Sequence, residues 1–242
     1  MFTGIIQGVA RIADINDHDA MRSFVIDFPC GFCQGIEPGA SISIDGVCLT
    51  VTALHSPDRV GFDVILQSLH VTTLGSYHIG SQVNVERAAR EGVEIGGHIL
   101  SGHIDFSTPL LSVRQIEGNK VLRIAVPENH MRYVFAKGYI AVNGASLTIS
   151  EVDKQALWFE VWLIPETRRM TVFENKQPGD AVNIEIERAT QVMVDTVYDC
   201  VDRSLGQLKP LLESLLQEKG LTLDSLLQIS PPTPAEKPSQ TR

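Results

Sequence analysis

The chain repeats itself at a distance of about one hundred residues. The segment ASISIDGVCLTVT at residues 40–52 returns as GYIAVNGASLTIS at residues 138–150, which is 98 positions later. Further along, VNVE at 83–86 returns as VNIE at 182–185, now 99 positions later, so one residue is inserted between the two matches. This period is too long for a solenoid repeat and has the size of a small domain. The sequence therefore predicts two copies of one fold.

Each copy has the pattern of a small β-barrel. Short apolar runs with strand-like alternation, separated by Gly, Pro, Asn and Asp, dominate up to about residue 188 and give about six strands per copy. The dipeptides Asp45-Gly46 and Asn143-Gly144 have the chemistry of two-residue hairpin turns. Because closure of a barrel removes exposed strand edges, we expect two tandem, similar six-stranded antiparallel barrels. The fold class is all-β with a C-terminal helix.

The period changes to that of a helix near Thr190. Apolar residues then recur at steps of three and four residues, namely Val194, Val197, Val201, Leu205 and Leu208. Gly206 and Pro210 are expected to interrupt this helix, with a second helical segment beyond them. The last thirteen residues contain four prolines and no large apolar side chain, which predicts a disordered tail. The predicted units are residues 1–97 and 98–188 for the barrels, 189–229 for a helical oligomerisation segment, and 230–242 for the tail.

Composition excludes several classes of function. The formal net charge is −9 and there is no basic run of five residues, which argues against nucleic acid and membrane surfaces as partners. No leader-like segment or long apolar stretch is found, so we expect a cytoplasmic protein. The four cysteines, Cys30, Cys33, Cys48 and Cys200, are too few for a disulfide framework and lack the pattern of a metal site.

Candidate functional groups gather at the junction of the copies and on one strand of each. Residues 94–103 read EIGGHILSGH, with His98 and His103 in a glycine-rich setting. Their odd spacing in a strand argues against a two-histidine metal site, and a buried structural histidine beside an exposed one is the alternative. After each hairpin turn, a polar face carries Cys48 in the first copy and Ser146 in the second. That face fits either a small-molecule site or a solvated sheet surface.

The ordered motifs of residues 1–188 resemble riboflavin synthases of the alpha type. These motifs are MFTGI, GVCLTVT, TTLG, VNVERA, EIGGHILSGHI, KGYIAVNGASLTI, LIPET and GDAVNIEIE. The resemblance implies two Greek-key barrels and a C-terminal helix that assembles a homotrimer, with active sites between subunits. It implies dismutation of two molecules of 6,7-dimethyl-8-ribityllumazine into riboflavin and 5-amino-6-ribitylaminouracil by transfer of a four-carbon unit, with no cofactor or metal. An association with lumazine synthase is left open.

The resemblance also implies a set of substrate-binding residues. The N-terminal wall would consist of Gly4, Ile5, Ile6, Cys48, Leu49, Thr50, a strand formed by Asp63, Val64, Ile65, Leu66, Gln67 and Ser68, and the segment Gly102, His103 and Ile104. The C-terminal wall would consist of Lys137, Ser146, Leu147, Thr148 and a strand formed by Trp162, Leu163, Ile164, Pro165, Glu166 and Thr167.

Catalytic roles follow from the chemistry of lumazine. Its C7 methyl group is acidic, so a base that titrates near neutral pH is useful, and His103 is the candidate, ahead of His98. Ser146, Thr148 and Cys48 are expected to position a nucleophile or stabilise an adduct. Asn143 stands where the family usually has an acidic residue beside Ser146, and its effect on the Ser146 hydroxyl is left open. The alternative function is a non-catalytic protein that holds lumazine or flavin as an optical antenna.

Overall fold

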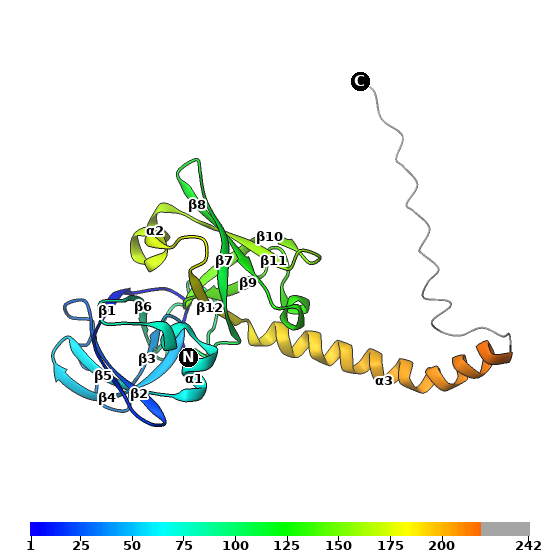
Figure 1. Ribbon diagram of the computed structural model, residues 1–242, viewed down its shortest axis with the longest axis horizontal. Coiled ribbons are helices and arrows are strands. Elements are labelled where there is room, and N and C mark those ends of the chain that lie inside the picture. The colour runs from blue at the N-terminus through cyan, green and yellow to red at the C-terminus, as the bar shows by residue number, and fades with distance from the viewer. Residues whose placement is uncertain (219–242) are drawn as a thin grey trace, which may run out of the picture. The chain divides into compact units, whose positions relative to one another are not determined.

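The computed structural model describes residues Met1–Glu218 of the 242-residue chain and contains two closed six-stranded antiparallel barrels (Figure 1). The first barrel, blue to cyan in the figure, consists of β1 (Gly8–Asp17), β2 (Met21–Asp27), β3 (Ser41–Ile44), β4 (Val47–Ser56), β5 (Arg59–Ile65) and β6 (Gln82–Arg87). The second consists of β7 (Phe106–Ile116), β8 (Asn119–Ala125), β9 (Tyr139–Val142), β10 (Ala145–Asp153), β11 (Trp158–Leu163) and β12 (Ala181–Ile186).

The two barrels have the same topology. Around the first barrel the strands follow the order β1-β2-β5-β4-β3-β6, and the second has the equivalent order with every strand number raised by six. The register is also repeated, since Ser43 pairs with Cys48 in the first barrel and Ala141 pairs with Ser146 in the second. The predicted duplicated barrel fold is therefore confirmed.

Alternation along β4 and β10 separates a core face from a polar face. Val47, Leu49 and Val51 are buried in the first barrel, while Cys48 is half-buried and Thr50 is exposed. On β10 the residues Ala145, Leu147 and Ile149 are buried, while Ser146 is half-buried and Thr148 is exposed. Each barrel encloses its own apolar core, so the polar faces carry Cys48 and Ser146 to the outside of the barrels.

The two predicted hairpin turns lie against each other. Asp45 and Asn143 have φ angles of 45° and 42°, and the glycines that follow also have positive φ, as the turn chemistry predicts. A Cβ atom on Gly46 would lie only 2.8 Å from the backbone nitrogen of Gly144. Glycine is therefore required here both for the left-handed backbone and for the close approach of the barrels.

Short helices replace the ends of two predicted strands. The segments 63–68 and 162–167 were each predicted as one strand, but β5 ends at Ile65 and β11 ends at Leu163. They are followed by α1 (Leu66–Val71) and α2 (Pro165–Met170), and then by the 3-10 helices η1 (Thr73–Ser76) and η3 (Val172–Asn175). Proline at the start of α2 favours a helix, because its missing N–H has no partner there in any case. A further 3-10 helix, η2 (Glu128–Tyr133), follows β8.

The C-terminal helix is longer than predicted. Helix α3 (Arg188–Glu218) continues through Gly206 and Pro210, so the predicted interruption is wrong. Proline removes one backbone hydrogen bond, and in a 31-residue helix this loss does not end the element. The predicted helical residues 219–229 and the predicted disordered tail 230–242 lie outside the described residues. Among the helices described, α3 included, none has the length and apolar character needed to span a membrane.

Candidate active site

Two buried glutamates at the barrel ends each hold a separate chain segment. The carboxylate of Glu86 on β6 accepts hydrogen bonds from the backbone N–H and hydroxyl of Thr3, both at 2.6 Å, and from the N–H of Gly4 at 3.1 Å. Burial raises the pKa of the Glu86 carboxyl group, and these hydrogen bonds oppose the shift. Both glutamates come from the repeated VN[VI]E motif.

Glu185 on β12 makes the same three contacts in the second copy. It accepts from the N–H and hydroxyl of Ser101, both at 2.7 Å, and from the N–H of Gly102 at 3.0 Å. Burial likewise raises the pKa of the Glu185 carboxyl group, against the effect of these hydrogen bonds. The segments Thr3–Gly4 and Ser101–Gly102 are therefore structural counterparts.

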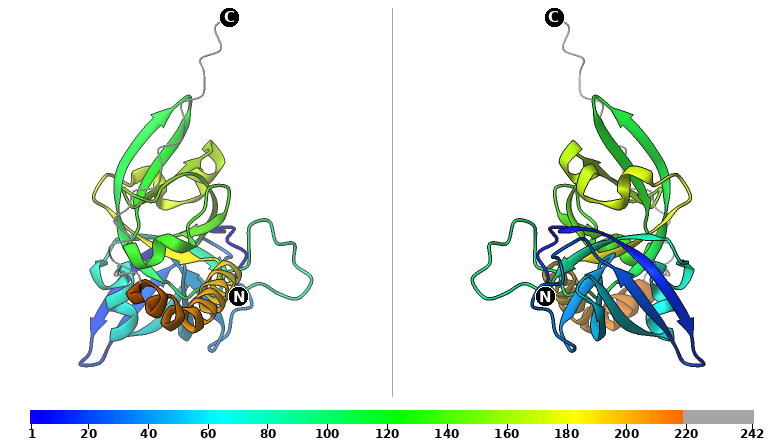
Figure 2. Two further views of the ribbon diagram at one scale, coloured as in Figure 1. Left: turned by 90° about the vertical axis from the view of Figure 1, so that its right-hand side faces the viewer. Right: turned by 90° about the vertical axis from the view of Figure 1, so that its left-hand side faces the viewer.

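Each held segment lies against the polar strand of the other barrel. The N–H of Ser146 on β10 donates to the carbonyl of Gly4 at 2.8 Å, and the N–H of Cys48 on β4 donates to the carbonyl of Gly102 at 2.8 Å. Figure 2 shows the dark-blue N-terminal segment along the boundary between the barrels. A Cβ atom on Gly4 would lie 2.5 Å from the Ser146 Cβ atom, and Gly102 meets Cys48 in the same way, so both sites need glycine.

This exchange corrects the predicted composition of the two walls. Gly4, Ile5 and Ile6 were assigned to the wall that contains Cys48, but the structure places them beside Ser146 of the second barrel. Gly102, by contrast, lies beside Cys48, as expected. Nothing in the repeat pattern reveals the exchange, because it depends on contacts between residues more than 80 positions apart.

A histidine–serine pair lies at the Ser146 site. Nδ1 of His98 is 2.6 Å from the Ser146 hydroxyl oxygen, and the His98 ring stacks on Tyr139 with centroids 5.4 Å apart. His98 is only 5% exposed, and burial lowers the pKa of its imidazole, so the ring is neutral near pH 7. A neutral imidazole nitrogen can accept the proton of a serine hydroxyl. The pair can therefore activate Ser146 as a nucleophile.

The two candidate histidines lie in different surroundings. His103 is exposed, and of the two it is His98 that forms the contact with Ser146. An odd spacing separates two side chains to opposite faces only in a strand, and residues 89–105, between β6 and β7, form no strand. The linker needs glycine at position 97 to approach Ser146, since a Cβ atom there would lie 2.6 Å from the Ser146 Cβ atom. Gly97 is therefore the feature of the sequence that could have indicated the contact between His98 and Ser146.

A cavity of about 290 Å³ opens beside this pair. It is lined by Gly4, Ile5, Ile6, Ala145, Ser146, Glu166, Thr167, Met170 and Thr171. Six of these nine residues, all except Ala145, Met170 and Thr171, are sequence-predicted site residues. Ile164, which is 57% exposed, precedes α2 and its Glu166. Glu166 is paired with Arg169 at 2.6 Å, and this hydrogen bond lowers the pKa of its carboxyl group.

The remaining predicted residues divide between core and surface. Leu49, Val64, Leu147 and Leu163 are buried in the barrel cores. Exposed or half-buried positions are taken by Thr50, Asp63, Ile65, Leu66, Gln67, Ser68, Ile104, Lys137, Thr148, Trp162 and Pro165. Asp63 accepts a hydrogen bond from the Ser23 hydroxyl at 2.6 Å.

Asn143 acts at the barrel interface and does not contact the Ser146 hydroxyl. Its side-chain oxygen accepts from the N–H of Asn183 at 2.7 Å, and its backbone carbonyl accepts from the Asn84 side chain at 3.0 Å. The side chain that contacts the Ser146 hydroxyl is that of His98. Within residues 1–218, no three His, Cys, Asp or Glu side chains are grouped so that they could hold a metal ion.

A family model and several solved structures identify the class of protein to which this chain is similar. The family model described as "Lumazine binding domain" matches residues 3–88 and again 101–187, which are the two barrels with their held segments. Among solved structures, that of LumP complexed with riboflavin superimposes with a TM-score of 0.72 at 26% identity. It covers 78% of this chain and 100% of LumP. A LumP complex with 6,7-dimethyl-8-(1'-D-ribityl) lumazine gives a TM-score of 0.70.

Within this class, the curated relatives are riboflavin synthases. Riboflavin synthase of Escherichia coli (strain K12) is 41% identical over 198 residues, covering 81% of this chain and 92% of the relative. Riboflavin synthase of Buchnera aphidicola subsp. Schizaphis graminum is 37% identical over 209 residues, covering 86% and 99%. The chain belongs to the riboflavin synthase family.

Proposed function

We propose that this protein converts two molecules of 6,7-dimethyl-8-ribityllumazine into riboflavin and 5-amino-6-ribitylaminouracil. A four-carbon unit passes from one lumazine to the other, and the atoms balance without an oxidant or added water. The two lumazine-binding repeats supply one position for each substrate. The observation that carries the proposal is the hydrogen bond between buried His98 and Ser146, which lines a cavity.

The pair gives Ser146 a defined chemical role. In the neutral tautomer with its proton on Nε2, His98 accepts the Ser146 proton at Nδ1 as the serine oxygen adds to an electrophilic ring carbon of lumazine. The proton returns to the serine oxygen when the adduct breaks. Nε2 of His98 is buried and has no hydrogen-bond partner among the described residues, which favours the uncharged ring that this role requires.

The two half-sites differ in their chemistry. Cys48 is the counterpart of Ser146, but its thiol makes no hydrogen bond within the described part of the chain. We infer that the lumazine beside Ser146 is the one that receives a nucleophile or base from the protein. The lumazine beside Cys48 and exposed His103 is positioned as its reaction partner, so that proximity supplies much of the rate.

We further propose a homotrimer in which each active site joins half-sites of two subunits. Several large apolar side chains on α3 are at least half exposed, namely Val192, Met193, Val197, Tyr198 and Val201. Near the Ser146 cavity, Ile5 is 48% exposed and Ile164 57% exposed. Apolar surface of this kind is typical of contacts between subunits. Four free cysteines support a reducing compartment, the cytoplasm.

The experiment mixes purified protein with 6,7-dimethyl-8-ribityllumazine and follows riboflavin by absorbance. One riboflavin for every two lumazines consumed, with turnover lost in Ser146→Ala, is the expected result. Binding of lumazine without turnover would overturn the proposal and favour the antenna function instead. Identity to curated riboflavin synthases of 41%, against 26% to LumP, supports the enzyme.

A further inference from the structure

A second and larger cavity lies between the two barrels. It measures about 670 Å³ and is lined from the first barrel by Arg11 on β1 and by residues of the stretch from Thr73 to Gln82. Residues of the stretch from Val172 to Ala181 line it from the second barrel. None of these residues lines the Ser146 cavity. Cavities of roughly 300–1,000 Å³ hold small organic ligands.

Two buried asparagines fix the walls of this cavity. The side-chain oxygen of Asn183 accepts from the N–H of Thr73 at 2.8 Å, and the side-chain oxygen of Asn84 accepts from the N–H of Val172 at 2.8 Å. Each bond therefore joins one barrel to the wall segment of the other. Both asparagines are 0% exposed. These bonds hold the wall segments in place, which lowers the entropic cost of binding.

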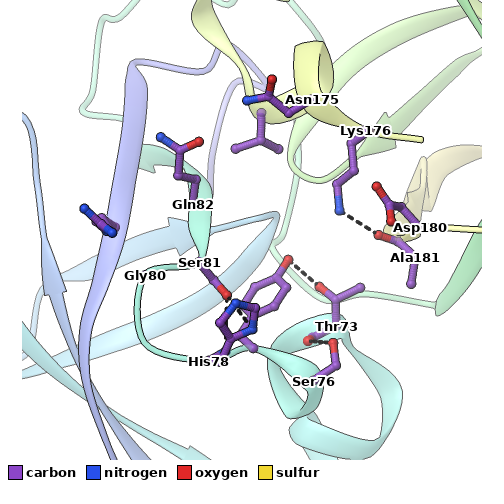
Figure 3. A pocket seen from close by; sticks show the side chains of 13 residues that line it. Thr73, Ser76, His78, Gly80, Ser81, Gln82, Asn175, Lys176, Asp180 and Ala181 are labelled. Carbon is purple, nitrogen blue, oxygen red and sulfur yellow. Dashed lines mark hydrogen bonds between the residues drawn. The ribbon is translucent and has the colours of Figure 1, made fainter.

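The cavity presents two cationic side chains, one from each barrel. Neither Arg11 nor Lys176 forms a salt bridge with a carboxylate among the described residues. The ammonium group of Lys176 donates to the carbonyl of Ala181 at 3.1 Å, which leaves donors for another acceptor (Figure 3). In a chain with a net charge of −9, two such cations around one cavity favour an anionic ligand.

The acidic groups near these cations are hydrogen-bonded within the protein, although Asp45 still attracts Lys176 and Asp27 still attracts Arg11. Asp180 lines the cavity, and its carboxylate accepts from the N–H of Gln177 at 2.9 Å. Asp45 lies behind the cavity wall, fully buried, where it accepts from the hydroxyl of Tyr77 and from the N–H of Asn84. Tyr77 and His78 are the other titratable residues of the lining, and the His78 ring contacts the Ser81 hydroxyl at 3.3 Å.

The rest of the lining is rich in hydrogen-bonding groups. Figure 3 shows Gln82 and Lys176 on opposite sides of the opening, with Asn175 between them at its upper edge. The side-chain amides of Gln82 and Asn175 make no hydrogen bond within residues 1–218. Ser76 donates its hydroxyl proton to the carbonyl of Thr73 at 2.8 Å, so its oxygen can still accept from a ligand. Such groups suit ligand hydroxyls better than a flat apolar ring.

We propose that this inter-barrel cavity binds a small phosphorylated polyol. Arg11 and Lys176 supply the positive charge that attracts its phosphate, and its hydroxyl groups are held by the amides of Gln82 and Asn175 and by the hydroxyl of Ser76. Lysine and arginine are the residues that recognise phosphate in proteins, through charge-assisted hydrogen bonds. The site is separate from the lumazine half-sites, so its occupancy does not depend on the proposed reaction.

Isothermal titration with ribose 5-phosphate at constant ionic strength tests this assignment. Ribose and inorganic phosphate correspond to the two halves of ribose 5-phosphate, and each is titrated separately for comparison. Ribose 5-phosphate is expected to bind at least tenfold more tightly than either half, since both sets of contacts are then made. Arg11→Gln and Lys176→Gln are each expected to weaken binding by about tenfold or more, the loss typical of a charge-assisted hydrogen bond.

The matched control is Lys154→Gln. Lys154 also belongs to the second barrel, but it lies over the Phe135 ring and lines neither cavity, so binding should be unchanged. Riboflavin formation at wild-type rates by the Arg11 and Lys176 variants checks that they fold. Absence of ribose 5-phosphate binding overturns the proposal. So does equal binding of inorganic phosphate alone, or an equal loss of affinity in Lys154→Gln, which would indicate only general electrostatic attraction.

Discussion

The hydroxyl oxygen of Ser146 lies 2.6 Å from Nδ1 of His98, and this contact joins the linker between the barrels to the polar strand of the second barrel. Proton transfer to a neutral imidazole contributes about 10²–10⁴-fold to the rates of enzymes that use it. We expect His98→Gln to lower kcat by about 10²-fold. The His103→Gln variant, at an exposed histidine, is the matched control and should lose less than His98→Gln. Steady-state kinetics with lumazine measure both, and an equal or larger loss in His103→Gln would contradict the assignment.

The pH profile offers an independent check of His98. Burial lowers the pKa of His98 below 6.5, so the neutral form that accepts a proton persists to acidic pH. Activity should therefore fall only as the pH drops through this lowered pKa, giving kcat/KM an acidic limb below pH 6.5. The limb should be absent from the residual activity of His98→Gln. Retention of the same limb in that variant would assign it to another group.

Asp45 is expected to make stability depend on pH. Complete burial raises the pKa of its carboxyl group from 3.8 to about 6, and hydrogen bonds from Tyr77 and Asn84 offset only part of this shift. Between these two pH values the folded state binds more protons than the unfolded state, so the free energy of unfolding falls as pH rises. Over this pH range the free energy of unfolding of Asp45→Asn should fall by about 2–3 kcal/mol less than that of the wild type.

Urea unfolding between pH 4 and pH 7 measures that difference. Asn143 is the natural counterpart of Asp45 in the second barrel. Its side-chain oxygen accepts from the N–H of Asn183, as the Asp45 carboxylate accepts from the N–H of Asn84. Asn143→Asp therefore serves as the converse variant and should add a decline of the same sign. Parallel pH curves for wild type and Asp45→Asn would contradict the prediction, because they would show that folding does not shift the pKa of this carboxyl group.

The repeat, the barrels and the two hairpins could be predicted from the sequence because each depends on residues close together in the chain. Alternation along β4 and β10 and the turn at Asp45-Gly46 are of this kind. The placement of each held segment against the other barrel could not be predicted. It depends on contacts such as that between Thr3 and Glu86, which are 83 positions apart, and no local pattern encodes such a contact. The contact of His98 with Ser146 was missed for a related reason, since the linker that carries His98 has no regular period.

Glu86 and Glu185, which hold the segments Thr3–Gly4 and Ser101–Gly102, should affect both the stability of the fold and the binding of substrate. Glu185→Gln puts an N–H₂ group where an oxygen accepts from Ser101 or Gly102, so a buried donor loses its partner. We expect a loss of about 1–3 kcal/mol in the free energy of unfolding and weaker lumazine binding. Glu86→Gln is the matched variant for the Ser146 half-site, and Glu37→Gln, at an exposed position, should change neither quantity. Denaturant titration and fluorescence-monitored lumazine binding check these outcomes.

Removal of residues 193–242 should abolish the proposed trimer without unfolding the barrels. The cut follows Val192 because Gln191 on the first turn of α3 donates to Asp105 at 2.8 Å and belongs to the compact unit Met1–Val192. If α3 assembles three subunits, light scattering should give the mass of one truncated chain, and riboflavin formation should stop because each half-site lacks its partner. Lumazine binding to single half-sites should persist, and it reports that the barrels are folded. A truncated protein that remains trimeric and active would assign assembly to the barrels, in which case the exposed side chains Ile5 and Ile164 become the next positions to substitute.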